Sequence, residues 1–175
     1  GAAVAAGVTA LDGGQAAEDA IVAIRHRPDV ASLVDPVTRL YFAYFERSPD
    51  PGGQAYWVKK RRNGTSLIVA SNTFAGSNEF KTKYGTLTNR AFVEKVYRNV
   101  LGRDGDAGGI TYWTNQLNAR RKSRGQVMLN FSESGEFVGK SRNRVDVANV
   151  WLSMYKRQPT KAQLDDLLAQ MTGGT

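Results

Sequence analysis

The sequence predicts an all-α protein built from a repeated helical unit, and three observations support this prediction. The segment Ser-Pro-Asp-Pro-Gly-Gly-Gln-Ala-Tyr-Trp at residues 48–57 returns as Asp-Gly-Asp-Ala-Gly-Gly-Ile-Thr-Tyr-Trp at residues 104–113. Apolar residues around both copies recur at the three- and four-residue spacing of amphipathic helices. The sequence shows no segment with the alternating pattern of a β-strand. We therefore expect two tandem four-helix repeats of about 56 residues, followed by a helical half-repeat and preceded by one helix.

The first repeat, residues 35–89, is expected to contain four helices. Asp35-Pro36 and Asp50-Pro51 each predict a helix start, because Asp is a preferred N-cap and Pro suits the first helical position. The four helices are expected to start at Asp35, at Asp50, at Thr65 or Ser66, and at Ser77.

The second repeat, residues 90–142, follows the same order. Its helices are expected over residues 91–101, over residues 106–120, around Phe131, and from a cap at Ser134. Residues 143–171 are a truncated third copy with two helices, which is typical of the cap of a repeat array. Residues 1–34 are expected to contain a flexible segment and a helix from Gln15 to about Arg27, and residues 172–175 are expected to be a tail.

Asp50, Asp106 and Thr160 occupy the same position in the three copies. They are either helix N-caps or, at Asp104-Gly105-Asp106, ligands of a calcium ion. Thr keeps a capping oxygen but is not a carboxylate ligand, and neither loop supplies the spaced oxygens and final Glu of an EF-hand. N-capping is therefore the favoured interpretation, and we predict no metal site.

Arg47, Arg103 and Arg157 form a second set of equivalent positions, and Glu79 and Glu136 form a third. We expect each Arg of a complete repeat to pair with the Glu of its own repeat, which would tie the loop between the first two helices to the start of the last one. A pair of catalytic carboxylates is the disfavoured alternative, because a catalytic site is rarely duplicated on successive repeats. Arg157 has no matching Glu and is expected to be free.

The Tyr-Trp pairs at residues 56–57 and 112–113 are either core residues or stacking platforms for sugars or bases. Their helical spacing favours the core, with one ring of each pair buried and the other partly exposed. Gly53 and Gly109 are expected to let a neighbouring helix or loop come close. The structural anchors of the repeat are therefore Arg47, Asp50, Gly53, Tyr56, Trp57, Glu79 and Phe80, with the counterparts Arg103, Asp106, Gly109, Tyr112, Trp113, Glu136 and Phe137.

Basic residues gather at the ends of the two Trp-bearing helices. Cations at a helix C-terminus are stabilising in themselves, so a solvated helix end is the default interpretation. Stacked repeats would nevertheless bring both clusters to one edge, which Lys140, Arg142 and Arg144 extend. This edge is the candidate ligand-binding surface, formed by Lys59, Lys60, Arg61, Arg62, Arg120, Arg121, Lys122 and Arg124.

The chain of 175 residues carries a net charge of +8, from 24 Lys and Arg against 16 Asp and Glu. This surplus favours anionic partners such as nucleic acid, acidic lipid or an acidic cell-envelope polymer. With no cysteine and His26 as the one histidine, the chain offers no disulfide, no thiolate zinc site and no support for a catalytic triad. We predict no cofactor, no enzymatic activity and no membrane span, since the sequence has no apolar run near the required length of about 20 residues.

The repeated motif is similar to the bacterial domain of unknown function number 4214. The motif consists of Leu-Tyr, then Arg-x-Pro-Asp-x-x-Gly-x-x-Tyr-Trp, then Ser-x-Glu-Phe, and residues 40–80 carry it in full. The second copy departs from it at Gly105, where Pro is usual, and the third copy lacks the Trp and the Glu-Phe pair. The resemblance covers roughly residues 35–171.

This resemblance implies a helical module that recurs in secreted and surface proteins of bacteria, including S-layer-like and haemolysin-type chains, without an established activity. The motif is also similar, more distantly, to the helical module of phycobilisome linkers, which holds other proteins together. The resemblance supplies no catalytic residue.

Two functions follow as hypotheses. The first is a non-enzymatic, extracellular or cell-surface module that binds an anionic envelope polymer or glycan through the basic edge. The alternative is a structural assembly module, which self-associates or joins a protein partner through an exposed apolar face. Nucleic-acid binding is less favoured.

Overall fold

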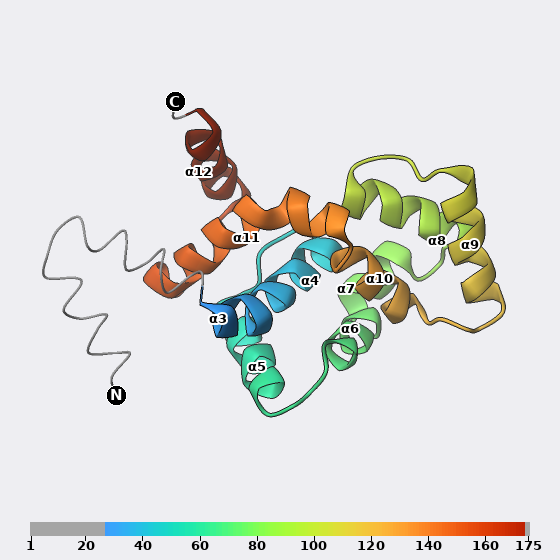
Figure 1. Ribbon diagram of the computed structural model, residues 1–175, viewed down its shortest axis with the longest axis horizontal. Helices are drawn as coiled ribbons and strands as arrows, with labels where there is room; N and C mark the ends of the chain where they lie inside the picture. Colours follow the sequence, from blue (N-terminus) through green and yellow to red (C-terminus); the bar gives the residue numbers. More distant parts are fainter. Residues whose placement is uncertain (1–26, 174–175) are drawn as a thin grey trace, which may run out of the picture.

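The computed structural model of the protein describes residues 27–173, and this part consists of helices and loops with no β-strand (Figure 1). The all-α prediction is therefore confirmed for these residues. The helix predicted from Gln15 lies outside them, apart from Arg27. The helices are α3 (Pro28–Leu33), α4 (Asp35–Phe45), α5 (Pro51–Arg62), α6 (Leu67–Ala75), α7 (Asn78–Tyr84), α8 (Asn89–Val96), the π-helix η1 (Tyr97–Leu101), α9 (Ala107–Asn118), α10 (Arg124–Ser132), α11 (Gly135–Tyr155) and α12 (Lys161–Gly173).

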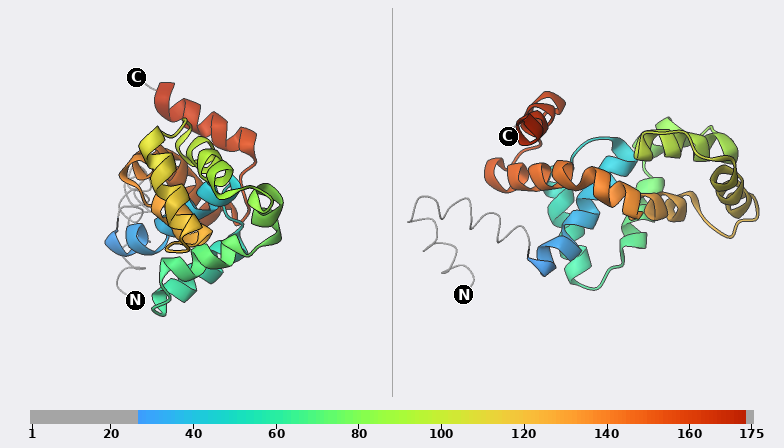
Figure 2. Two further views of the ribbon diagram at one scale, coloured as in Figure 1. Left: turned by 90° about the vertical axis from the view of Figure 1, so that its right-hand side faces the viewer. Right: turned by 45° about the horizontal axis from the view of Figure 1, so that its top comes forward.

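Helix α4 lies at the centre of the molecule. It packs directly against α6 and α10, which also pack against each other, and against α11 (Figure 1). Helices α8 and α9 form one end of the long axis, while α3 and α5 lie toward the other end, as Figure 2 also shows. The core therefore joins both repeats, because its buried residues come from α4, α6, α8, α10 and α11.

The second and third copies are fused by one long helix, and this corrects the sequence prediction. A short helix from Ser134 and a separate first helix of the third copy were expected, but α11 runs for 21 residues across the expected boundary at residue 142. Between the first two copies the chain breaks at Gly85, where an added Cβ would lie 2.4 Å from the carbonyl oxygen of Lys81. The position of α11 that corresponds to Gly85 holds Arg142, and the helix continues through it.

The first helix of each repeat also differs from its prediction. Asp35 is not an N-cap, because Val34 before it already has helical backbone angles and α3 leads almost directly into α4. The Asp35 carboxylate instead accepts a hydrogen bond from Asn149 on α11, at 3.0 Å. In the second repeat the expected helix over residues 91–101 is divided into α8 and the π-helix η1.

The N-capping interpretation of the aspartates is confirmed. Asp50 accepts a hydrogen bond from the backbone N–H of Gly53 at 2.7 Å, and Asp106 accepts one from Gly109 at the same distance. Thr160 caps α12 through its hydroxyl, which accepts from the backbone N–H of Gln163 at 3.2 Å. All three positions therefore start the second helix of a copy.

A left-handed residue ends the first helix of every copy, which the sequence prediction missed. Glu46, Gly102 and Lys156 have φ angles of 56°, 65° and 52° and directly precede the repeated arginines. The left-handed turn stops the helix and redirects the chain, so that the following Arg points back toward the repeat. Only the second copy has glycine at this position. The three left-handed residues therefore could not be predicted from the preference of glycine for this conformation.

The glycines Gly53 and Gly109 bring the second helix close to the first. A Cβ atom added to Gly53 would lie 2.3 Å from the hydroxyl oxygen of Tyr41, and one added to Gly109 would lie 2.2 Å from that of Tyr97. These separations are far inside van der Waals contact. The expected packing role of both glycines follows from this geometry, with the tyrosine of the first helix as the close neighbour.

Replacing Gly109 tests this contact. We expect Gly109→Ala to lower the free energy of unfolding by about 1–3 kcal/mol, because the new methyl group displaces the Tyr97 ring. Adding Tyr97→Phe should recover most of this loss, since the next atoms lie 3.2 Å from the new Cβ. Gly139→Ala in α11, where a Cβ meets nothing within 4 Å, is the control and should stabilise the helix by about 0.5–1 kcal/mol. Urea unfolding measures all four proteins, and an unchanged stability of Gly109→Ala contradicts the packing role.

Candidate functional site

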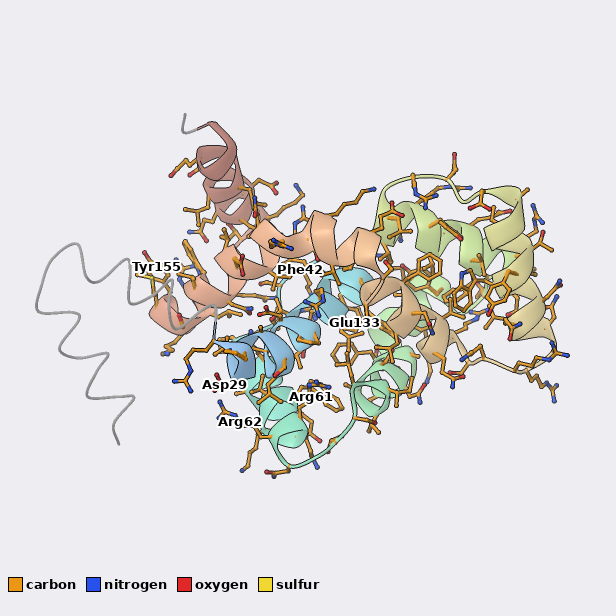
Figure 3. The ribbon with its side chains drawn as sticks, viewed as in Figure 1. Asp29, Phe42, Arg61, Arg62, Glu133 and Tyr155 are labelled. Atoms are coloured by element: carbon orange, nitrogen blue, oxygen red, sulfur yellow. The ribbon has the colours of Figure 1, made fainter. Side chains whose placement is uncertain are left out.

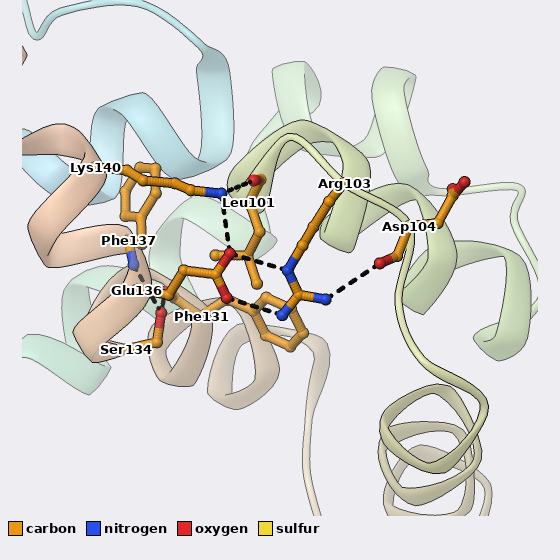
Figure 4. A network of polar contacts seen from close by, with 8 residues as sticks. All are labelled: Leu101, Arg103, Asp104, Phe131, Ser134, Glu136, Phe137 and Lys140. Atoms are coloured by element: carbon orange, nitrogen blue, oxygen red, sulfur yellow. Dashed lines mark hydrogen bonds and ion pairs between the residues drawn. The ribbon is translucent and has the colours of Figure 1, made fainter.

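A bidentate ion pair links the two ends of the second repeat (Figure 4). Arg103 donates from Nε and Nη2 to the two carboxylate oxygens of Glu136, at 2.9 and 2.8 Å. Its Nη1 donates to the carbonyl oxygen of Asp104 at 3.1 Å. Lys140 donates to Glu136 at 2.9 Å and to the carbonyl oxygen of Leu101 at 2.7 Å. The loop after η1 is thereby fixed to the first turn of α11.

The first repeat contains the same ion pair. Arg47 donates to both carboxylate oxygens of Glu79, at 3.1 and 2.9 Å, and to the carbonyl oxygen of Ser48 at 3.3 Å. Its guanidinium group lies 5.7 Å from the ring centre of Tyr41, the same residue that contacts Gly53. The predicted Arg–Glu pairing is therefore present in both complete repeats, and both glutamates are held as structural anions.

Glu136 is held strongly in its charged form. The hydrogen bonds from Arg103, and then those from Lys140, lower the pKa of this carboxyl from 4.5 to about 2. A general acid near neutral pH needs the opposite shift. This electrostatic environment gives no support to the catalytic-carboxylate alternative.

Arg157 is not free, which corrects the prediction. Its Nη1 donates to the side-chain oxygen of Gln163 at 3.3 Å, and its guanidinium group lies 5.0 Å from the ring centre of Trp151. Gln163 thus replaces the missing Glu as an acceptor from within α12. The third copy keeps a weaker, neutral version of the repeated contact.

The Tyr-Trp pairs divide as predicted between the core and the surface. Trp57 is buried and Trp113 packs against the core, whereas Tyr56 and Tyr112 are 53% and 52% exposed. Each tyrosine meets its tryptophan edge-on, with ring centres 5.1 and 5.0 Å apart. The exposed tyrosine rings are therefore held in a fixed position on the outer face of α5 and α9.

Two of the eight candidate basic residues have structural roles. Arg124 donates to the carbonyl oxygens of Tyr84 and Leu87, and its guanidinium group lies 4.8 Å from the ring centre of Phe92. Burial lowers the pKa of Arg124. Arg61 donates to the carbonyl oxygen of Ser32 at 2.9 Å and so ties α5 to α3.

The other six candidates are Lys59, Lys60, Arg62, Arg120, Arg121 and Lys122. Within the described part of the chain, none of them forms an ion pair. By contrast, every Asp and Glu of residues 27–170 has an interaction partner within the chain. Unpaired cations therefore gather in two groups at the ends of α5 and α9, whereas Lys81, Arg142 and Lys156 stand singly elsewhere in the chain.

The two helices that end in the basic clusters lie apart along the molecule. Arg61 and Arg62 lie at the lower end of α5 in Figure 3, while α9 lies at the right-hand end of the molecule, with α6 and α10 between them. The repeats are wrapped around the shared helix α4 instead of being stacked side by side. We therefore define two separate surfaces, the α5 cluster (Lys59, Lys60 and Arg62) and the α9 cluster (Arg120, Arg121 and Lys122).

A buried polar network between α4, α5 and α11 was not predicted. Asn149 accepts hydrogen bonds from Thr38 at 2.6 Å and from Gln54 at 2.7 Å, and it donates to Asp35. These residues lie beside a hollow of about 670 Å³ between α3, α5 and α11. None of the four belongs to the repeated motif, so the repeat comparison gave no signal for them.

An apolar groove between α11 and α12 was also missed. Its volume is about 320 Å³, and it is lined by Asp146, Val147, Val150, Trp151, Met154, Tyr155 and Leu167. Met154 and Tyr155 are 58% and 53% exposed. The available signal was the substitution of Trp151 and Leu167 for the tyrosine and tryptophan of the complete repeats.

The fold and these contacts define a tandem helical-repeat module whose motif residues hold the fold together. Residues 71–141 match the model of a family described as a domain of unknown function, DUF4214. This match confirms the resemblance over that span, which runs from α6 into α11 and includes most of the second repeat. Comparisons with curated proteins and with solved structures give no match. The similarity to phycobilisome linkers stays a prediction.

Two further observations concern ligands and membranes. In residues 27–170, no three His, Cys, Asp or Glu side chains gather as a metal site would require. No helix in the described part is long and apolar enough to cross a membrane.

The Arg103–Glu136 pair predicts a pH dependence of stability. Because the folded-state pKa of Glu136 is lowered, its stabilising effect is complete above about pH 4.5 and is lost as the pH falls toward 2. We expect Glu136→Gln to be less stable than the wild type at neutral pH, with the difference shrinking toward pH 2. Urea unfolding at a series of pH values measures this, with Glu94→Gln, which removes a surface pair within α8, as the control. A difference that stays constant with pH contradicts the role of this ion pair.

Proposed function

We propose that the protein is a non-enzymatic binding module that attaches to an anionic cell-envelope polymer or glycan outside the cell. The observation that carries this proposal is a contrast within residues 27–170: the α5 and α9 clusters form no ion pair, whereas every Asp and Glu has an interaction partner. Internal pairing leaves these cations available to an external anion. The extracellular location rests on the family resemblance alone.

The separation of the clusters favours an extended ligand. A small anion can contact only one cluster, since α5 and α9 lie toward opposite ends of the long axis (Figure 2). A long polymer can contact both clusters at once, and the second contact then forms at a high effective concentration. We therefore infer that chain length of the polymer, more than its sugar identity, determines affinity.

Exposed aromatic rings support a glycan in particular. Lys60 lies 5.6 Å from the ring centre of Tyr56, so the α5 cluster joins a cation to a ring face. Tyr112 is the equivalent exposed ring on α9, where Gln116 takes the place of Lys60. At the α5 cluster, ring stacking on a sugar and attraction to its acidic groups can therefore act at the same place.

A second candidate function is structural assembly through an apolar face. The exposed Met154 and Tyr155 beside the α11–α12 groove favour it. Strictly monomeric behaviour in light scattering over a wide concentration range, together with no partner recovered in a pulldown, contradicts this candidate.

Retention on alginate, a long acidic polysaccharide, tests the first proposal. We expect replacing either Lys59, Lys60 and Arg62 or Arg120, Arg121 and Lys122 with Gln to weaken binding by about tenfold at low salt, because each set removes one point of attachment. Both sets together should abolish binding, and added NaCl should weaken the wild type in the same direction.

The matched control replaces Lys81, Arg142 and Lys156, three exposed cations outside both clusters, with Gln. It removes the same charge and should retain nearly full affinity. Equal losses in the control and in the cluster variants contradict a defined binding surface, because they show that net charge alone is responsible. Short alginate fragments that bind as tightly as the polymer contradict the two-point attachment.

A further inference from the structure

A hollow of about 430 Å³ lies where α4, η1, α11 and α12 meet, and no residue of the α5 or α9 cluster lines it. Part of its lining is apolar and buried, including Phe42 and Val100. One position of η1 and two consecutive turns of α11 add polar side chains, namely Asn99, Lys140, Ser141, Asn143 and Arg144. A partly apolar hollow with a few polar groups is the usual form of a site for a small molecule.

Arg144 has no counter-ion at this hollow. Among residues 27–170 it forms no ion pair, and its guanidinium group lies 5.5 Å from the ring centre of Phe42. The carboxylate that also lines the hollow, that of Glu46, is already paired with Lys83 at 2.6 Å. The hollow therefore offers one unpaired guanidinium group, which can bind a carboxylate through two parallel hydrogen bonds.

Lys140 lies one turn before Arg144 and is held in place by the chain (Figure 4). Its ammonium group donates to the carbonyl oxygen of Leu101 at 2.7 Å and to the Glu136 carboxylate at 2.9 Å. An ammonium group has three donors, so one N–H of Lys140 is still available. Residues four apart lie on the same side of a helix, and both cations line the hollow. One anion can therefore bind to both of them.

Ser141 supplies a buried hydroxyl group beside these cations. It is 4% exposed, and its oxygen has no hydrogen-bond partner among the described residues. The equivalent residue of the first repeat is Tyr84, whose hydroxyl accepts a hydrogen bond from Asn99 at 3.0 Å. A buried hydroxyl group without a partner costs free energy, and most such groups are hydrogen-bonded. An anion in the hollow would provide the missing acceptor.

The π-helix η1 forms another part of the wall. The equivalent residues of the first repeat, 41–45, lie in the α-helix α4, so this feature belongs to the second copy within the described part of the chain. Turns of π-helix are rare and are frequent at functional sites. The η1 residue Asn99 uses its amide N–H to bind Tyr84, which leaves its side-chain oxygen as an acceptor at the hollow.

We propose that this hollow binds a small hydroxylated carboxylic acid, in particular a free sugar acid. Its carboxylate accepts hydrogen bonds from Arg144, Ser141 and the remaining N–H of Lys140. Its hydroxyl groups bind the side-chain amides of Asn99 and Asn143, and its ring lies against the apolar part of the lining. The site uses none of the six cations of the α5 and α9 clusters, so the proposal is independent of polymer binding.

Titration of the full chain with glucuronate, followed by NMR, tests the proposal. We expect saturable shifts of the side-chain amide signals of Asn99 and Asn143 and of the backbone signal of Gly102, which also lines the hollow. Glucose has the hydroxyl groups without the carboxylate, and acetate has the carboxylate without the ring. Each should bind about tenfold more weakly or less, because each loses one set of contacts. Equal affinity for inorganic phosphate overturns the sugar acid, since it shows that charge alone is recognised.

Two variants make the test specific. Arg144→Gln should weaken glucuronate binding by about tenfold or more, because it removes the charged donor. Ser141→Ala should weaken it about threefold to tenfold without lowering the free energy of unfolding of the free protein, since the hydroxyl has no partner there. Unchanged circular dichroism shows that both variants remain folded.

The matched control is Arg142→Gln, which removes a neighbouring cation of α11. Arg142 lines a different hollow of about 250 Å³, which Ser141 also borders. This variant should bind glucuronate normally. Binding that is lost in Arg142→Gln and kept in Arg144→Gln overturns the proposal, because it places the acid in the other hollow.

Two further results overturn the proposal. One is the absence of saturable shifts at millimolar glucuronate. The other is a loss of alginate retention in Arg144→Gln as large as in the cluster variants, which assigns Arg144 to the polymer surface. Alginate retention should instead be the same in Arg144→Gln as in the wild type. The cluster variants thus test polymer binding, and the glucuronate titration tests the hollow, so that each proposal can fail alone.

Discussion

The structure depends on the insertion of one phenylalanine ring between two helices. Phe74 and Phe131 each contact a tyrosine of the first helix and a tryptophan of the second, and so convert three short helices into one packed unit. The other repeated residues prepare this arrangement. The aspartate caps set where the second helix begins, and the glycine that follows lets the tyrosine approach it. The Arg–Glu pair then fixes the loop between them.

Much of this was predictable from the sequence, because a repeat lets each position be checked against its copies. Thr160 holds the position of Asp50 and Asp106, and this favoured N-capping over calcium binding at all three. The Arg–Glu pairing was predicted because the Arg and the Glu recur together in both complete repeats. Features that differ between copies were not predictable in this way. The fused helix α11 results from the loss of a helix-breaking segment, and the left-handed positions hold Glu, Gly and Lys. The contacts of Asn149 lie between copies, so comparison of copies could not reveal them.

The candidate site was predictable in composition but not in layout. The sequence identifies the cations at the helix ends, yet it does not show that Arg61 and Arg124 bind backbone carbonyl groups. The two copies share α4, α6 and α10 as one core instead of stacking, and this separates the remaining clusters. The motif residues are thus used for packing, while the unpaired cations of the two clusters lie at helix ends outside the motif.

The most direct test of the account is native-state hydrogen exchange on the wild type and on Phe131→Leu. If the phenylalanine holds the second helix of its own repeat, the substitution should selectively reduce the protection of amides in α9. Protection in α5, which depends on Phe74, and in α12, which has no such residue, should change little. An equal loss of protection in α5, α9 and α12 would show that the ring supports the core as a whole, and it would contradict the account.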